Sequence, residues 1–247
     1  MRIGILTCGH VDPPLSHESG QYADMISANL GAVDNTFEFA NFDATKGELP
    51  DLDSCHGFII TGSVMNAYDD DPWILALCDW IVSCEARHKP LVGICFGHQL
   101  IARALGGKVE KSTKGWGLGS YEVNITSQKK WMNLSVDSLR MLVSHQDQVV
   151  IVPSGMKVLA TNDFCPNFML AKDNHILTVQ GHPEFSAEFT RLLIEKRRSL
   201  ITENHYFDAL EQINKPQDSS LVLHWISAFY FCNHRYLSQN ELELTAK

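Results

Sequence analysis

The chain has 247 residues, of which 45 % are hydrophobic and 20 % charged, and its formal net charge is −9. This length predicts one large domain and leaves too little chain for two ordinary ones. An acidic chain without a basic cluster is a poor match to nucleic acid, and no apolar run approaches a signal peptide or a transmembrane span. We therefore expect a soluble, cytoplasmic protein that binds neither nucleic acid nor membranes.

The seven cysteines are odd in number, scattered, and never spaced as C-x-x-C. This distribution argues against both a disulfide framework and a zinc site. The acidic run from Asp69 to Asp71 directly precedes Pro72, an arrangement that is typical of a helix start rather than of a cation site. The sequence thus predicts no metal and no cofactor.

Strand-like and helical patterns alternate along the chain. Strand-like runs lie near residues 2–8, 36–41, 57–61, 90–94, 118–126, 149–152, 157–161, 168–172 and 175–180. Helical patterns lie near residues 19–31, 72–88, 97–105 and 186–203. The alternation through residue 105 is typical of βαβ units, whereas residues 107–180 form shorter strands joined by turns. The sequence predicts an α/β fold with an open, mostly parallel sheet flanked by helices and a small antiparallel extension.

A cysteine between two glycines follows the strand-like run 90–94. Residues 93–97 read Gly-Ile-Cys-Phe-Gly, and a helical pattern begins at Phe96. A strand-to-helix turn this sharp strains the backbone of its central residue, and a β-carbon two positions before or after that residue would clash. The free N–H groups and the dipole of the helix start favour a thiolate. The pattern predicts a nucleophile elbow with an exposed Cys95 at the carboxyl edge of the sheet. The alternative is a buried structural cysteine.

A histidine and a glutamate follow the strand-like run 175–180, where residues 181–184 read Gly-His-Pro-Glu. A thiol nucleophile needs a base to move its proton and a carboxylate to orient that base. Residues at i and i+2 of an extended chain point to one side, and Pro183 favours extended backbone at His182. We expect Glu184 to orient His182, and His182 to serve Cys95. The alternative is a loop histidine beside a glutamate that favours the helix dipole.

A glycine-rich segment, residues 115–119, has the spacing of a phosphate loop but lacks the G-K-[ST] ending and the following helix. Its glycines are expected to permit close backbone approach near the site. Trp116 is a candidate for the lining of the pocket.

The last segment, residues 204–247, contains a candidate helix. Apolar residues recur at helical spacing between Leu221 and Asn233, and such a wide apolar face must be buried. Packing on the same domain would bury it, and so would contact with a second copy in a homo-oligomer. We divide the chain into a domain over residues 1–200 and a helical extension over residues 201–247 that packs on this domain.

These segments resemble the class I glutamine amidotransferases, which carry Cys-His-Glu triads in this chain order. The similarity covers residues 93–99 and 181–184, and it extends to Thr61-Gly62-Ser63 and to residues 144–149. Within that family the chain is most similar to stand-alone members, the γ-glutamyl peptidases and the GMP synthase-like proteins. The resemblance implies a flavodoxin-like core in a glutamine amidotransferase-like domain over residues 1–200.

The resemblance also implies roles for individual residues. The catalytic positions of the family correspond to Cys95, His182 and Glu184. Its substrate-binding elements correspond to Gln99, Ser144, His145 and Gln146. The N–H groups of Gly62 and Phe96 would form the oxyanion hole. Many family members carry a double glycine at this loop, and we expect residue 62 to need a backbone conformation that is open to glycine alone.

The implied activity is that of a thiol hydrolase that cleaves the γ-carboxamide of glutamine through a γ-glutamyl thioester on Cys95 and releases ammonia. A γ-glutamyl peptidase acting on γ-glutamyl amides or peptides would use the same residues, and the sequence does not choose between the two. A catalytically silent binding or regulatory domain is the alternative from another class, and the intact triad disfavours it. The chain shows no P-loop and no Ser-Gly-Gly-x-Asp run, so an ammonia-accepting synthase would be a separate subunit.

Overall fold

The computed structural model describes the backbone of residues 1–13 and 15–245 and the side chains of residues 1–13 and 15–234. The strands are β1 (Arg2–Thr7), β2 (Glu38–Asp43), β3 (Gly57–Ile60), β4 (Leu91–Ile94), β5 (Lys108–Lys111), β6 (Gly117–Ile125), β7 (Ser138–His145), β8 (Asp147–Ile151), β9 (Met156–Thr161), β10 (Met169–Lys172) and β11 (Ile176–Val179). The helices are α1 (Leu15–Ser19), α2 (Tyr22–Val33), α3 (Pro72–Ala86), α4 (Phe96–Ala104), α5 (Ala187–Lys196), α6 (Glu203–Gln212) and α7 (Ser219–Thr245), with 3-10 turns η1 (Ala44–Lys46) and η2 (Arg198–Leu200). Residues 246 and 247 of the expected extension over residues 201–247 lie outside the described residues.

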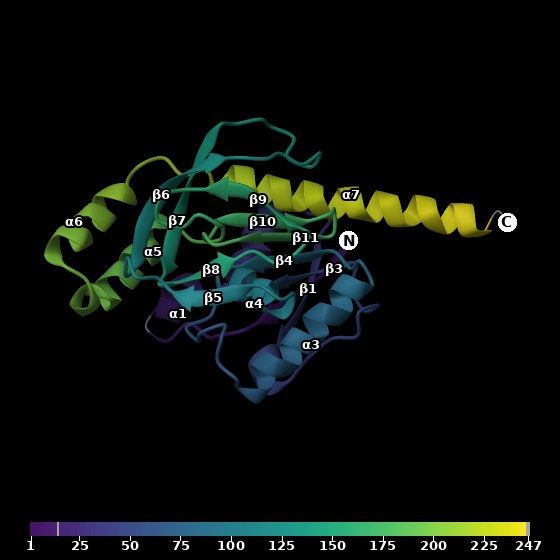
Figure 1. The fold of residues 1–247 in the computed structure, drawn as a ribbon, viewed down its shortest axis with the longest axis horizontal. Coiled ribbons are helices and arrows are strands. Elements are labelled where there is room, and N and C mark those ends of the chain that lie inside the picture. Colours follow the sequence, from purple (N-terminus) through teal and green to yellow (C-terminus); the bar gives the residue numbers. More distant parts are fainter. Residues whose placement is uncertain (14, 246–247) are drawn as a thin grey trace.

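Within the described residues, nine strands form one sheet in the order β2-β1-β3-β4-β11-β10-β9-β6-β7. The strands from β2 to β11 pair in parallel, and the strands from β11 to β7 pair antiparallel. Strands β5 and β8 form a separate antiparallel pair. The predicted α/β fold with a mostly parallel sheet flanked by helices is confirmed, and its antiparallel strands lie together at one side of the sheet (Figure 1).

Helices cover both faces of the sheet because successive strand residues point to opposite sides. In β1, Ile3 and Ile5 join one apolar cluster and Leu6 joins another. Helices α2 and α7 pack on the first face, and α3 and α4 pack on the second (Figure 1). A third cluster joins α1, α5 and α6 to side chains of β6 and β7.

The apolar face of α7 is buried against the sheet of the same chain. The buried side chains of this face are Val222, Leu223, Trp225, Ile226, Phe229 and Tyr230. The hydroxyl of Tyr230 donates to the backbone oxygen of Phe58 at 2.7 Å. A β-carbon at Gly57 would lie 2.6 Å from the Tyr230 ring, so glycine is what permits this close approach. These α7 side chains are therefore already covered within one chain.

Several elements differ from the sequence-based prediction, among them strands β5 and β7 and helix α1, which the patterns did not predict. Strand β7 was not predicted because five consecutive residues at its carboxyl end are buried, which removes the alternating polar pattern. The helix predicted over residues 186–203 is instead α5 followed by the 3-10 turn η2, and a separate helix, α6, begins at Glu203. Helix α5 ends at Lys196, and α6 begins behind Thr202, whose side chain accepts a hydrogen bond from the N–H of His205. Arg197 is the residue directly after α5, with φ −101° and ψ 6°.

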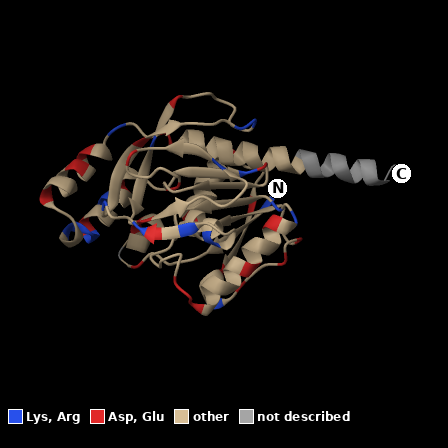
Figure 2. Ribbon diagram, in the orientation of Figure 1, with Lys and Arg blue, Asp and Glu red and all other residues tan. Residues whose placement is uncertain are grey.

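Acidic residues lie along α3 and α6, and a run of basic residues, 196–198, begins at the last residue of α5 (Figure 2). In the part of the chain that the structure describes, none of the helices has the length and apolar character needed to cross a membrane.

Candidate active site

Cys95 lies between β4 and α4, in a backbone conformation that side chains rarely adopt. Its φ is 52° and its ψ is −100°. A β-carbon at Gly93 would lie 2.6 Å from the backbone oxygen of Gly97, and one at Gly97 would lie 2.3 Å from that of Ile60. Glycine is therefore required at both positions, and the geometry is that of a nucleophile elbow.

The expectation of an exposed Cys95 was wrong. Only 6 % of the residue is accessible, and it belongs to the apolar cluster on the α2 and α7 face of the sheet. The residue lies on the wall of a cavity that segments far apart in the sequence close around it. A local strand-to-helix pattern carries no information about these segments.

His182 and Glu184 form a buried pair just beyond β11. Nδ1 of His182 lies 2.8 Å from Oε1 of Glu184, and both side chains are almost fully inaccessible. The imidazole stacks on the ring of Phe185 with the centroids 3.8 Å apart. The N–H of His182 donates to the backbone oxygen of Leu142 at 2.9 Å, which ties the loop to β7. The ring is therefore held in one orientation by a carboxylate, an aromatic face and the backbone.

The electrostatics of this pair favour a charged imidazole. Burial lowers the pKa of His182, but the neighbouring Glu184 carboxylate and the Cys95 sulfur, by charge and by hydrogen bonding, more than reverse this effect. The pKa of His182 is therefore raised above its ordinary range. The other carboxylate oxygen, Oε2 of Glu184, is buried without a hydrogen-bond partner among the described residues. Such a site suits a thiolate beside an imidazolium.

Gly62 lies against the same histidine. A β-carbon at Gly62 would lie 3.1 Å from Cε1 of His182 and 3.8 Å from Cβ of Cys95. The expectation that residue 62 needs a glycine-only backbone was wrong, because its φ is not among the positive ones. Close approach to the imidazole is the reason for glycine here. Among the described residues, no hydrogen bond uses the N–H of Gly62 or that of Phe96, so both donors remain available.

A cavity of about 310 Å³ opens beside Cys95. The residues that the resemblance marks for substrate binding all line it: Gln99, Ser144, His145 and Gln146. Oγ of Ser144 and Nε2 of His145 are buried without partners among the described residues. Gln99 differs, because its amide nitrogen already donates to the backbone oxygen of Asp147 at 2.8 Å and to Oε1 of Gln180 at 3.1 Å. Only its carbonyl oxygen is left for a substrate.

Trp116 lines this cavity, as the sequence suggested, and three cations that sequence reasoning missed line it too: Lys111, Lys196 and Arg197. The guanidinium of Arg197 lies 4.7 Å from the centre of the Trp116 ring. Burial lowers the pKa of Arg197, although the nearby Tyr22 and Cys95 counteract this. The position of Arg197 just after the end of α5 offered no sequence signal for a site.

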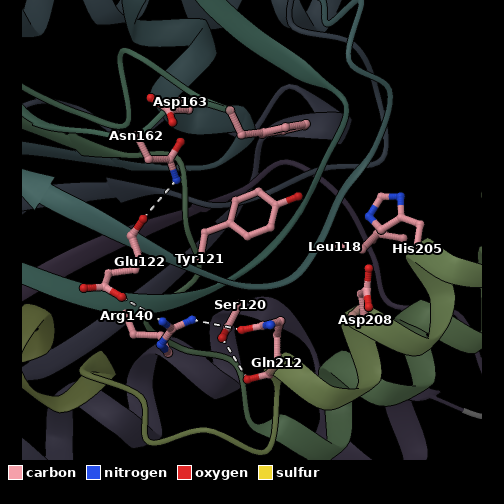
Figure 3. Close-up of a pocket in the computed structure, with 12 residues that line it drawn as sticks. Leu118, Ser120, Tyr121, Glu122, Arg140, Asn162, Asp163, His205, Asp208 and Gln212 are labelled. Atoms are coloured by element: carbon pink, nitrogen blue, oxygen red, sulfur yellow. Dashed lines mark hydrogen bonds and ion pairs between the residues drawn. The ribbon is translucent and has the colours of Figure 1, made fainter.

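A second cavity, of about 610 Å³, lies between β6, β7 and α6 (Figure 3). Three of its charged and polar groups bind one another: Arg140 pairs with Glu122 at 2.9 Å and reaches Gln212 at 3.2 Å. The residues that line it include none of the candidate catalytic or substrate-binding side chains. This cavity therefore does not share the chemistry of the Cys95 site.

Asp71 and Pro72 begin α3 as expected, although the Asp71 side chain makes no capping hydrogen bond. Across residues 1–13 and 15–234, His, Cys, Asp and Glu side chains form no group of three that could hold a metal ion. All seven cysteines are free thiols in this structure.

Comparison with known proteins points to one family. The sequence profile of the family described as Glutamine amidotransferase class-I matches residues 17–197. A glutamine amidotransferase-like protein of Schizosaccharomyces pombe is 31 % identical over 219 residues, which cover 82 % of this chain and 88 % of that protein. Gamma-glutamyl peptidase 4 of Arabidopsis thaliana is 35 % identical over 185 residues, which cover 72 % of this chain and 73 % of that protein. The fold is similar to that of a glutamine amidotransferase from Thermotoga maritima, with a TM-score of 0.73 and 22 % identity over 94 % of this chain and 96 % of that one.

Proposed function

The chain belongs to the class I glutamine amidotransferase family, and we propose that it is a thiol hydrolase that cleaves γ-glutamyl carboxamides through a γ-glutamyl thioester on Cys95. The observation that carries this proposal is the strained Cys95 on a cavity wall, beside a His182 that Glu184 orients at 2.8 Å. A structural cysteine would need neither the strain nor the charged neighbours.

The proposed reaction proceeds in two steps. The Cys95 sulfur attacks the γ-carbonyl carbon, and the oxygen takes up negative charge that the N–H groups of Gly62 and Phe96 stabilise. The C–N bond then breaks, and His182 gives its proton to the departing nitrogen. In the second step water attacks the thioester while His182 accepts its proton. The C–S bond breaks, its electron pair returns to sulfur, and the glutamyl product leaves.

Glutamine is the simplest substrate for this reaction, with ammonia as the leaving group and a separate synthase as its consumer. A γ-glutamyl peptide is the second candidate, and the shape of the site favours it. The cavity beside Cys95 shares Lys111, Trp116, Gln146 and Leu200 with a further cavity of about 750 Å³. This space would accept an extended leaving group. Several relatives of this chain are named gamma-glutamyl peptidases.

The test is incubation of the pure protein with glutamine, glutathione and a γ-glutamyl anilide, with ammonia, Cys-Gly and the free amine measured separately. Ammonia alone supports the glutaminase, and release of Cys-Gly or the amine supports the peptidase. Labelling by an electrophilic glutamine analogue detects a reactive Cys95 in an enzyme that turns over slowly. No release and no labelling would leave a silent binding domain and overturn the proposal.

Replacing Glu184 by glutamine should lower the rate of hydrolysis by about 10³- to 10⁴-fold, a smaller decrease than replacement of Cys95 or His182 should cause. The amide oxygen can still accept from Nδ1 of His182. Without the carboxylate charge, however, the pKa of His182 falls, so less imidazolium is present at neutral pH. The measurement is kcat/KM with the best of the three substrates. A loss larger than that of His182→Asn would contradict the orienting role.

Gly62→Ala should slow hydrolysis by about 10²-fold or more, and it should also slow alkylation of Cys95 by iodoacetamide. The new β-carbon would press on Cε1 of His182, which cannot yield because the ring is stacked on Phe185. Gly31→Ala is the control, since a β-carbon at this position in α2 would meet only the Phe39 ring, at an ordinary contact distance of 3.9 Å. If Cys95 of the Gly62→Ala variant is alkylated at the wild-type rate, the contact between residue 62 and His182 is unimportant.

A further inference from the structure

Gln180 contacts the sulfur of Cys95, although neither the sequence patterns nor the resemblance marks this residue. It follows β11 directly and is fully buried. Its Nε2 lies 3.6 Å from Sγ of Cys95, within hydrogen-bond distance for sulfur. The contact is set by the sheet, because β11 pairs with β4 and the N–H of Cys95 donates to the backbone oxygen of Val179 at 2.9 Å.

The orientation of the Gln180 amide follows from its neighbours. A backbone carbonyl can only accept, so the oxygen of Asp147 requires the nitrogen of the Gln99 amide, at 2.8 Å. The same Gln99 nitrogen then donates to Oε1 of Gln180 at 3.1 Å. The oxygen of the Gln180 amide is thereby directed to Gln99, and its nitrogen is left facing Cys95.

A buried amide donor must have an acceptor, because burial without one is costly. Among the described residues, the acceptor found for Nε2 of Gln180 is the Cys95 sulfur. A neutral thiol accepts hydrogen bonds only weakly, whereas a thiolate accepts them strongly. A hydrogen bond to a charged sulfur therefore offsets the free-energy cost of burying the Gln180 amide.

We propose that Gln180 is a catalytic residue that donates a hydrogen bond to the Cys95 thiolate, with Gln99 as the positioning residue that orients the Gln180 amide. The inference rests on the proposed function. The sulfur then has two donors, the imidazolium of His182 and the amide of Gln180. In the first step these donors increase the thiolate fraction and hold the sulfur. In the second step the amide stabilises the charge that returns to sulfur as the C–S bond breaks.

The test measures the pH dependence of Cys95 alkylation by iodoacetamide in Gln180→Leu and in Gln180→Met, whose side chain has a similar length but no donor. The reactive midpoint should move up by about one pH unit, so alkylation below the midpoint slows about tenfold. Both variants retain the ionisable groups around the sulfur, which are His182, Glu184, Tyr22, Cys165 and Arg197. They also retain the ionisable groups that line the same cavity, Lys111, Asp147 and Lys196.

Thr178→Val is the matched control. Thr178 is fully buried in β11, two residues before Gln180, and its hydroxyl bonds to Nδ1 of His98 at 2.7 Å rather than to Cys95. Loss of this hydroxyl should lower the free energy of unfolding without moving the midpoint of Cys95 alkylation. Gln99→Leu should give a smaller upward shift, because the Gln180 amide can then turn. Iodoacetamide has no glutamyl group, so this shift is separate from any part that Gln99 plays in substrate binding.

An unchanged or lowered midpoint in the folded Gln180 variants would overturn the proposal, and if neither variant folds, the Gln99→Leu midpoint decides in the same way. The alkylation needs no substrate. A protein that hydrolyses nothing would thus contradict the proposed function and leave this measurement intact, whereas normal hydrolysis with an unmoved midpoint would contradict only the role of Gln180.

Discussion

Replacing Cys95 by alanine is expected to reduce hydrolysis of the best γ-glutamyl substrate by about 10⁵- to 10⁶-fold, to background. Without the sulfur no thioester can form, and water alone is a poor substitute for a nucleophile that the elbow and the His182–Glu184 pair activate. The measurement is the initial rate of product release, compared between the wild type and the variant at equal protein concentration.

The same variant should remain folded, with the free energy of unfolding lowered by about 1 kcal/mol. Cys95 is buried, so the loss of its sulfur removes some packing and leaves the amide of Gln180 without its acceptor. For a chain of this size that change moves the Tm by roughly 2–4 °C. Retained hydrolysis in a folded Cys95→Ala protein would eliminate the thioester mechanism.

His182→Asn should be as inactive as Cys95→Ala, because the asparagine can neither activate the sulfur nor protonate the leaving nitrogen. It should also be the less stable of the two. The imidazole stacked on Phe185 is lost, and the inaccessible Glu184 carboxylate loses the partner that was 2.8 Å away. Leaving a buried charge unpaired costs about 3–5 kcal/mol.

The double variant His182→Asn with Glu184→Gln is the matched control, because it removes the unpaired charge. It should recover stability over the single variant and stay equally inactive.

The raised pKa of His182 also predicts a pH dependence. Stabilisation by the charged pair is fully present below the unfolded pKa of about 6.5 and is lost as the pH rises through the raised folded value. The Tm difference between the wild type and His182→Asn should therefore shrink at alkaline pH. A constant or growing difference would show that His182 is not charged in the folded protein.

Several features of the site could be predicted because they depend on neighbours in the sequence. The two glycines around Cys95 are required by contacts within the elbow and with the adjacent strand, and the strain they permit is local. His182 and Glu184 do meet locally, as expected, but not on an extended chain: Pro183 and Glu184 lie in a turn in which the N–H of Phe185 donates to the backbone oxygen of His182 at 3.4 Å. The alternation of strands and helices up to residue 105 similarly predicted the parallel half of the sheet.

Other features depend on residues that are far apart in the sequence, and these were missed or misread. The carboxyl half of strand β7 is buried on both faces, so its sequence there lacks the period of two that marks a half-exposed strand. Gly62 was expected to serve its own backbone conformation, but the structure gives its purpose as contact with His182, 120 positions later.

The sequence by itself determined the nucleophile, its base and the orienting carboxylate as candidates, because each lies in a short motif whose geometry is local. Only the tertiary structure decided that Cys95 is buried, that Arg197 lines its cavity, and that Gln180 contacts the sulfur. Gln180 lies beside Cys95 because β11 pairs with β4, although the two residues are 85 positions apart in the sequence. Such a pairing is selected by the packing of the whole sheet, and no local pattern encodes it.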